Sequence, residues 1–431
     1  MKKNIIIFIS LILGLTILGA ACNLFHKNQE LEVSITAELS ASHIINLLAK
    51  DNTHPLLVNA ITKANQNKKE PTEPYIEIFG KAFENTNPDI PLVKLFNIDK
   101  IDESLTNNSS NEETLNALHK EIDKRVIETI TILKKRINRF GIRNNKFEQI
   151  ENTERVLIEI PKVENIERVK HLIQTRAVLG FWETYDNQEI FQSLEEVNEK
   201  IKTLLANGKI ELNGKEFQPT DYVLDTTTMV ETEWAQKYPL FAVLTPRVNQ
   251  QGQIVPGPCI GNAFERDTST VTGLLRLPEV TNLLPNNLKL AWTVKPAPWD
   301  ATNSIYELIA LKVNNKDNTP PLDGTYITKA SPEEGSQGNA YITITKNKEG
   351  AKIWQRLTAD NIGRSIAITL DNKVYSYPLV NAEIKGGRSS ISGDFNMQEA
   401  SDLANVLQAH PLPAPISIVD VNTKNDSLDE N

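Results

Sequence analysis

The sequence has little of what marks a nucleic-acid-binding protein or a small disulfide-stabilised domain. Its 55 acidic residues outnumber its 46 basic ones, which gives a formal net charge of −9. Contact with phosphates needs a positive surface that releases counterions, so we expect no nucleic-acid partner. The two cysteines, Cys22 and Cys259, are too few for a disulfide framework. Cys259 has no His or second Cys nearby at metal-ligand spacing, and we expect a small buried or loop residue there.

Patterns that mark enzymes are also missing. The six histidines lack metal-ligand spacing, and no Gly-x-Ser-x-Gly turn or phosphate-binding glycine loop occurs. Gly386-Gly387 is not followed by Lys-Ser/Thr, so we expect a tight turn with positive φ. Asp371 lies between two predicted strands, where a turn aspartate is far commoner than a catalytic one. We predict that the chain is not an enzyme and has no catalytic residue, cofactor or metal.

Long apolar runs are absent except at the N-terminus. Lys2 and Lys3 precede residues 5–21, which are apolar apart from one Ser and one Thr, and Cys22 follows. A basic start, an apolar middle and small residues before the Cys form an export-signal pattern. Beyond residue 24 no run approaches the ~17–25 residues that cross a bilayer. We expect a membrane-anchored protein whose domain faces the periplasm or extracytoplasmic side.

Two interpretations of the N-terminus remain open. The run Leu18-Gly19-Ala20-Ala21-Cys22 approximates a lipoprotein cleavage box, in which Cys22 becomes lipidated. The large aliphatic residue lies four positions before the Cys instead of the usual three. The alternative is an uncleaved helix that anchors the chain.

The first half of the chain predicts a ferredoxin-like sheet. The apolar residues Val126, Ile130, Leu133 and Ile137 recur at helical spacing, and Gly141 follows as a left-handed helix end. The basic residues of this helix are expected on its solvated face, where they complement the helix dipole; they are Lys134, Lys135, Arg136 and Arg139. Strand, helix, hairpin, helix and strand is the order of a split βαβ unit whose two helices cover one face. The expected elements are 30–36, 114–140, 146–151 with 155–160, 166–177 and 179–183.

The second half predicts two further segments. Residues 184–338 mix short helices with Pro-rich and Asn-rich turns, and we expect an irregular insertion. An α+β module follows, in which Asp371-Asn372 turns between two strands and 416–421 forms an edge or returning strand. The polar, acidic end is expected to be disordered.

Several segments resemble the extracytoplasmic domain of the protein-export subunit SecD. Residues 133–142 are similar to the family's helix that ends before a Gly, and 156–161 to its strand that ends in Pro. Residues 361–371 are similar to its Asn, Gly and Ala-Ile-hydrophobic-Leu-Asp pattern, and 181–185 look most like the fused SecDF proteins of Bacteroidota. The positions that match family motifs are Gly141, Pro161, Gly363, Asp371, Pro378, Gly386, Gly387, Gly393, Pro413 and Pro415.

The resemblance implies the fold class and a division of the chain. The fold is α+β, with a ferredoxin-like base, an α+β head and a long irregular insertion. The predicted divisions are 1–22, signal peptide or membrane anchor; 23–183, base; 184–338, insertion; 339–421, head; and 422–431, disordered acidic tail.

The resemblance also implies an accessory or split SecD-like component of Sec-dependent protein export. Its partners would be unfolded exported polypeptides and the Sec translocon or a complete SecDF. The family's Gly-rich motif before the first strand is missing, and the chain ends where the family continues into membrane helices. We therefore expect no proton-driven motor in this chain. Two alternatives are an envelope lipoprotein binding module that reuses the fold, and a decaying SecD paralogue.

A domain that binds unfolded chains needs an apolar groove or an open sheet edge. The resemblance places it within about residues 184–407, although no individual residue is identified. Tyr375 and Tyr377 are two residues apart, so their rings should face the same side of a strand. We expect ordinary packing of these rings rather than a peptide-binding face. Burial is the expectation for Trp234, Trp292, Trp299 and Trp354.

Overall fold

The computed structural model describes residues 31–68, 73–86, 89–212, 214–222, 229–315, 318–335 and 339–425. The chain forms two compact units, of which unit 1 comprises Met1–Arg176 with Leu412–Asn431, and unit 2 comprises Ala177–Pro411. The predicted signal or anchor, with Cys22, lies outside the described residues. So do residues 426–431 of the predicted tail.

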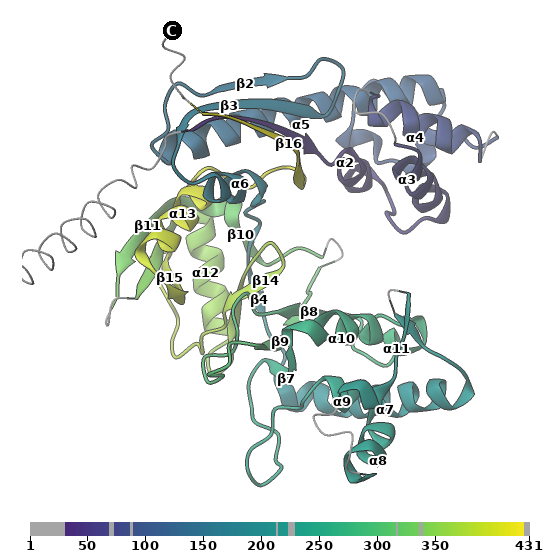
Figure 1. Ribbon diagram of the computed structural model, residues 1–431, viewed down its shortest axis with the longest axis vertical. Coiled ribbons are helices and arrows are strands. Elements are labelled where there is room, and N and C mark those ends of the chain that lie inside the picture. The colour runs from purple at the N-terminus through teal and green to yellow at the C-terminus, as the bar shows by residue number, and fades with distance from the viewer. Residues whose placement is uncertain are drawn as a thin grey trace, which may run out of the picture. The chain divides into compact units, whose positions relative to one another are not determined.

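Unit 1 is built on a four-stranded antiparallel sheet in the order β16-β1-β3-β2. With two helices the chain order is β-α-β-β-α-β, so the predicted ferredoxin-like base is confirmed (Figure 1). The sheet buries one row of β1 side chains, including Val33, Ile35 and Ala37. The elements are β1 (Leu31–Leu39), α5 (Asn111–Arg139), β2 (Lys146–Gln149), β3 (Arg155–Val163), α6 (Ile166–Gln174) and β16 (Ile416–Asn425).

The fourth strand of this sheet differs from the prediction. It is β16, from the other end of the sequence, which pairs with β1 so that Ile35 lies opposite Val421 (Figure 1). The predicted strand, β4 (Leu179–Glu183), belongs to unit 2. Its first four residues are all buried, which requires a sheet covered on both faces, whereas the outer strand β16 leaves several side chains exposed. Residues 422–425 are therefore strand rather than part of a disordered tail.

Two more expectations for unit 1 are wrong. Arg136 is fully buried, not solvated, because its guanidinium reaches the end of α6. Pro161 lies inside β3 and does not end it. The proline is tolerated because Glu159 is the last residue of β3 that pairs with β2, so Pro161 has no β2 partner. On its other side it lies beside an irregularity in the pairing with β1.

Further helices of unit 1 stand between β1 and α5. A capping box of Ser110 and Glu113 begins α5 at Asn111, three residues before the predicted start. The helices are α2 (Ala41–Leu48), α3 (Pro55–Asn67), α4 (Tyr75–Glu84), η1 (Leu92–Leu95) and η2 (Ile98–Lys100).

Part of unit 2, which we call the head part, holds two sheets, in the orders β10-β4-β13-β14 and β11-β12-β15. The helix α13 packs on β11 and β12. The strands are β4, β10 (Leu322–Asp323), β11 (Ile327–Glu334), β12 (Ala340–Lys346), β13 (Ile366–Leu370), β14 (Lys373–Ser376) and β15 (Arg388–Phe395). The helices are η5 (Gly324–Tyr326), α12 (Lys348–Asp360) and α13 (Met397–Gln408).

The rest of unit 2, from α7 to β9, is the inserted body. The sequence predicts an irregular segment here, but the structure shows a 21-residue helix and a three-stranded sheet in the order β7-β9-β8. They enclose a separate apolar core, which includes Ile190, Leu194, Leu274 and Leu308. The helices are α7 (Asn187–Asn207), η3 (Pro219–Tyr222), α8 (Met229–Lys237), α9 (Pro239–Val243), η4 (Glu265–Asp267), α10 (Thr268–Leu275) and α11 (Pro278–Thr281). The strands are β5 (Glu211–Leu212), β6 (Lys215–Glu216), β7 (Cys259–Phe264), β8 (Leu288–Trp292) and β9 (Ile305–Lys312).

Candidate functional site

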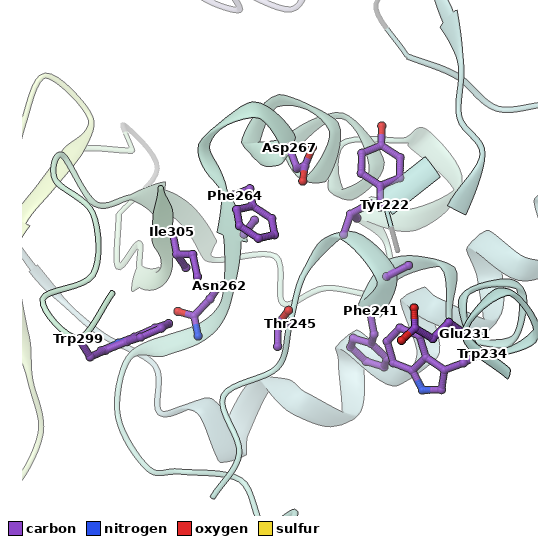
Figure 2. Close-up of a pocket in the computed structure, with 13 residues that line it drawn as sticks. Tyr222, Glu231, Trp234, Phe241, Thr245, Asn262, Phe264, Asp267, Trp299 and Ile305 are labelled. Atoms are coloured by element: carbon purple, nitrogen blue, oxygen red, sulfur yellow. The ribbon is translucent and has the colours of Figure 1, made fainter. Parts of the chain in front are cut away.

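The inserted body contains a pocket of about 430 Å³ that we call the aromatic pocket (Figure 2). Helices α8 and α9 form one wall, and β7 with the segment before β9 forms the other. Five of its side chains are aromatic, and the remainder are mainly small or aliphatic. The lining residues are Tyr222, Glu231, Trp234, Phe241, Ala242, Val243, Thr245, Asn262, Ala263, Phe264, Asp267, Trp299 and Ile305.

The helical wall is held by a row of aromatic contacts. The ring of Trp234 lies 5.7 Å from that of Tyr238, which lies 6.5 Å from that of Phe241. Phe241 also stacks on Phe191 of α7 at 6.1 Å. Pro239 begins α9 directly after α8, because proline is favourable at the first position of a helix. The chain passes from α8 to α9 at this point, and Trp234 of α8 and Phe241 of α9 both lie on the helical wall of the pocket.

The opposite wall depends on a tight loop after Trp299. The Asp300 carboxylate accepts hydrogen bonds from the backbone N–H groups of Thr302, Ser304 and Ile305, each at 2.8–2.9 Å. These bonds, with one from the Thr302 hydroxyl as the largest cause, lower the pKa of Asp300 to about 2. The carboxylate is therefore charged at neutral pH, and the loop that presents Trp299 is fixed at its base.

Two of the four tryptophans considered above are exposed at this pocket. Trp234 is 44% exposed and Trp299 is 58% exposed. The expectation of burial is correct for Trp292 and Trp354, at 8% and 4%, and wrong for these two. No local sequence pattern distinguishes the exposed tryptophans from the buried ones, because the exposure follows from the fold of the inserted body.

The charge in the pocket is negative. Glu231 and Asp267 line it, and no Lys or Arg of the described residues does. Asp267 is 6% exposed, and burial raises the pKa of its carboxyl group, while the neighbouring Arg266 at 3.6 Å lowers it. The aromatic and aliphatic lining of the pocket can accept apolar or aromatic side chains.

The motif residues of the sequence analysis lie elsewhere, mostly in turns of the head part. Gly363, Gly386 and Gly387 have φ values of +80°, +88° and +71°. A Cβ atom at Gly387 would lie 2.7 Å from that of Ala351. The Asp371 carboxylate accepts from the backbone N–H groups of Ala177 and Val178, at 3.1 and 2.8 Å. It is therefore a structural turn residue beside β4.

Two more motif residues of the head part have packing roles. The Pro378 carbonyl accepts a hydrogen bond of 3.2 Å from Ile366 N–H. A Cβ atom at Gly393 would meet the Phe395 ring at 2.9 Å.

The motif residues of unit 1 also lie in its framework. Gly141 follows α5 with a φ of +95°. The carbonyl of Pro413 accepts from Arg176 at 3.2 Å, and that of Pro415 accepts from Ser40 N–H at 2.9 Å. Like the motif residues of the head part, they do not line the aromatic pocket.

Tyr375 and Tyr377 do not share one face, contrary to expectation. The Tyr375 ring stacks on Phe395 at 5.9 Å, whereas Tyr377 packs with the buried cluster around Trp182 and Cys259. The chain leaves β14 at Ser376, so the alternation of a strand stops between the two rings.

Cys259 is buried, as predicted, with 1% exposure. Burial raises the pKa of its thiol to about 11, so the group is protonated at neutral pH. Among the residues that the structure describes, no group of three or more His, Cys, Asp or Glu side chains is placed to hold a metal ion. No helix within the described ranges is long and apolar enough to cross a membrane.

Two family models match the chain. The SecDF P1 head subdomain matches residues 310–414, and the N-terminal part of the P1 domain of protein translocase subunit SecDF matches residues 126–186. The aromatic pocket lies in neither segment.

Curated relatives with sequence similarity are SecD subunits. The protein translocase subunit SecD of Rhodothermus marinus is 31% identical over 408 residues, which cover 92% of this chain and 61% of the relative. The SecD subunit of Calditerrivibrio nitroreducens is 41% identical over 111 residues, 26% of this chain and 22% of the relative. The chain thus spans 61% or less of the length of these relatives.

Solved structures of SecDF also resemble the chain. A SecDF in a super-membrane-facing form has a TM-score of 0.37 at 21% identity, over 70% of this chain and 28% of that one. A SecDF described as a membrane component that enhances protein export has a TM-score of 0.36 at 21% identity, over 69% of this chain and 93% of that one.

Proposed function

We propose that this chain, two segments of which match models of the SecDF P1 domain, is a component of Sec-dependent protein export. In this role it binds translocating polypeptide through the aromatic pocket of the inserted body. A polypeptide that has not folded exposes apolar side chains, which a folded protein buries. A pocket that selects exposed apolar side chains would therefore select unfolded segments.

The observation that carries the proposal is the exposure of Trp234 and Trp299, at 44% and 58%, on opposite walls of one pocket (Figure 2). Large apolar side chains grouped at the surface of a protein mark an interaction site. The volume of about 430 Å³ lies within the range of about 300–1,000 Å³ that is usual for small-ligand sites. The pocket therefore has room for one or two side chains of a bound segment. Contact through side chains of any apolar type would tolerate many sequences.

The structure of the pocket favours retention of a segment without chemistry on it. The pocket would hold the segment through its aromatic and aliphatic side chains, and the bound polypeptide would leave unchanged. Release would follow from folding of the segment, which removes its apolar side chains from reach. We propose the Sec translocon as the partner that delivers such segments.

We also propose that the N-terminus holds the domain at the outer face of a membrane, with Cys22 as the lipidated residue. The basic start and apolar run of residues 2–21 support this position. Cells fed radiolabelled palmitate should label the protein, and Cys22→Ser should remove the label. Unchanged labelling in the variant would exclude Cys22 as the modified residue.

The export role is tested by photocrosslinking in growing cells. A photoreactive phenylalanine analogue replaces Trp299, and in a matched control it replaces Leu47, an exposed apolar residue of unit 1 with 52% exposure. We expect newly made exported precursors to crosslink from position 299 and not from position 47. Equal crosslinking from both positions, or none to precursors from position 299, would contradict the proposal.

A further inference from the structure

A second pocket, mainly in the inserted body, has the opposite charge to the aromatic pocket, and we call it the cationic pocket. Its volume of about 730 Å³ lies within the range of about 300–1,000 Å³ that is usual for small-ligand sites. The end of α10, the segment after α11, strand β8 and the start of β14 surround it. The two pockets share no lining residue, so they are separate sites.

Much of the lining of the cationic pocket is aliphatic. Leucines from α10, β8, β9 and the segment after α11 contribute to it, and they belong to or pack against the apolar core of the inserted body. They are Leu275, Leu284, Leu288, Leu290 and Leu308. The indole N–H of Trp292 donates to the Thr272 hydroxyl at 3.1 Å, so this ring also offers the pocket an apolar surface. This part of the lining suits an aliphatic chain.

Three cations from three different elements line the same pocket. Arg276 follows α10, Lys289 is in β8, and Lys373 begins β14. No Asp or Glu of the described residues lines the pocket. None of the three cations makes an ion pair in the part of the chain that the structure describes. In a chain of net charge −9, this pocket therefore favours an anion.

Lys289 is the cation with the least access to water. It is half-buried, whereas Arg276 and Lys373 are exposed. Its Nζ lies 4.4 Å from the centroid of the Trp182 ring, a contact that holds the ammonium group in place. Burial lowers the pKa of Lys289, and no neighbouring carboxylate among the described residues opposes this shift. A bound anion would supply the opposite charge that stabilises the ammonium group.

The edge of β8 is closed, which excludes an added β-strand as the ligand. Leu288 N–H donates to the Pro285 carbonyl at 2.9 Å, and Val294 N–H donates to the Val374 carbonyl at 2.9 Å. Thr293 also forms a parallel bridge with Val374. Since these contacts occupy the edge on both sides of Leu290, the cationic pocket suits a compact ligand that enters beside the strand.

We propose that the cationic pocket binds an aliphatic chain that ends in a carboxylate. The chain would contact the leucines, and the carboxylate would pair with Lys289, with Arg276 and Lys373 contributing further positive charge. A fatty acid and the C-terminus of an apolar peptide share this chemistry. The site has no residue in common with the aromatic pocket, so the inference does not depend on the proposed export role.

The test is isothermal titration calorimetry of the purified full chain with sodium octanoate. 1-Octanol keeps the chain and removes the charge, octyltrimethylammonium reverses the charge, and acetate removes the chain. The dipeptide acetyl-Leu-Leu with a free carboxyl group represents a polypeptide C-terminus, and its amide is the matched control. All variants are compared in the same solution, so uptake elsewhere is equal among them.

Octanoate should bind at least about tenfold more tightly than 1-octanol, octyltrimethylammonium or acetate. Lys289→Met should weaken octanoate about tenfold and leave 1-octanol within about threefold. Arg276→Gln/Lys373→Gln changes only exposed side chains, so it should keep the fold and weaken octanoate about fivefold. The control Lys329→Gln/Lys352→Gln, at exposed positions of β11 and α12, should leave the affinity unchanged.

A preference for acetyl-Leu-Leu over octanoate, lost in its amide, would support the site and identify a polypeptide C-terminus as the ligand. The inference is overturned if neither carboxylate binds, or if 1-octanol binds as tightly as octanoate. It is also overturned if Lys289→Met and Arg276→Gln/Lys373→Gln both keep the wild-type affinity. Loss of binding in Trp234→Ala/Trp299→Ala alone would then place the ligand in the aromatic pocket.

Discussion

The hydroxyl of Tyr377 donates a hydrogen bond of 2.5 Å to the carboxylate of Glu307. The other carboxylate oxygen of Glu307 accepts from Arg247 at 3.1 Å. Tyr377 directly follows β14 of the head part, whereas Arg247 and Glu307 belong to the inserted body. Glu307 is 3% exposed, so its charge depends on these partners for stabilisation. This contact couples the inserted body, which contains the aromatic pocket, to the head part.

Tyr377→Phe should therefore destabilise unit 2. The change removes one hydrogen bond to a buried charge, which contributes about 1.5–3 kcal/mol. Urea unfolding of the full chain measures the loss. The matched control is Tyr306→Phe, at a half-buried position of β9 whose hydroxyl makes no hydrogen bond to the described residues; it should change stability by less than about 0.5 kcal/mol. Equal effects of the two variants would mean that the Tyr377–Glu307 bond contributes nothing.

Arg136→Met should destabilise unit 1. The guanidinium donates to the carbonyl groups of Leu172, at 3.1 Å, of Thr175, and of Arg176, at 3.3 Å. These carbonyls lie at the C-terminal end of α6, where the helix supplies no N–H partners. Leaving them without this donor should cost about 1–3 kcal/mol, measured by urea unfolding. Arg139→Met, at an exposed position of the same helix, is the control and should have little effect.

Lys346 should make stability depend on pH. The side chain is 5% exposed, between the rings of Phe181 and Trp354, at 4.9 and 4.5 Å, and donates to Ser389 Oγ at 2.6 Å. Burial lowers the pKa of Lys346 to about 7, although the rings favour the charged form. The unfolded chain then binds the proton more tightly than the folded one. Lowering the pH from 10.5 toward 7 therefore favours unfolding.

Comparison with Lys346→Met isolates this effect. Between pH 9 and pH 7 the wild type should lose roughly 2 kcal/mol of unfolding free energy relative to the variant. Urea unfolding at both values checks it. Lys348→Met, at an exposed position two residues later, should keep the dependence of the wild type. A constant difference between wild type and Lys346→Met would show that Lys346 has the same pKa in both states.

The double variant Trp234→Ala/Trp299→Ala should weaken binding of unfolded polypeptide without unfolding the protein. Both side chains are substantially exposed, so their removal should lower the midpoint of thermal unfolding little. Loss of two aromatic anchors should reduce affinity for a permanently unfolded, dye-labelled reporter polypeptide at least about tenfold. Anisotropy titration measures it, with Leu47→Ala as the exposed control. Unchanged affinity would exclude the aromatic pocket as the binding site.

The sequence predicted the ferredoxin-like base because its helices and strands have clear periodicity. It did not predict that β16 closes the sheet in place of β4, since the pattern of residues 416–421 indicates an edge or returning strand without identifying its partner strand. The choice depends on burial: Phe181 packs on Trp354 of the head part, and Trp182 packs in a cluster with Cys259 and Ile309 of the inserted body, so unit 2 covers both faces of β4. Pairing of strands more than two hundred residues apart leaves no local pattern.

The aromatic pocket could not be predicted for a related reason. Trp292 and Trp299 are seven residues apart, yet one lies in a core and the other at the surface. The Asp300 loop that exposes Trp299 is recognisable only from its hydrogen bonds. Similarly, Arg136 lies among exposed Lys134, Lys135 and Arg139, and its burial follows from the position of α6.

Pulse-chase measurement of protein export tests most directly whether the aromatic pocket serves export. Cells in which the chromosomal copy carries Trp234→Ala/Trp299→Ala are compared with wild-type cells and with cells that lack the protein. The protein level is checked in each strain. If the aromatic pocket serves export, the variant should accumulate unprocessed precursors as the deletion strain does. Wild-type export kinetics in the variant, alongside a defect in the deletion strain, would show that the pocket has no part in export.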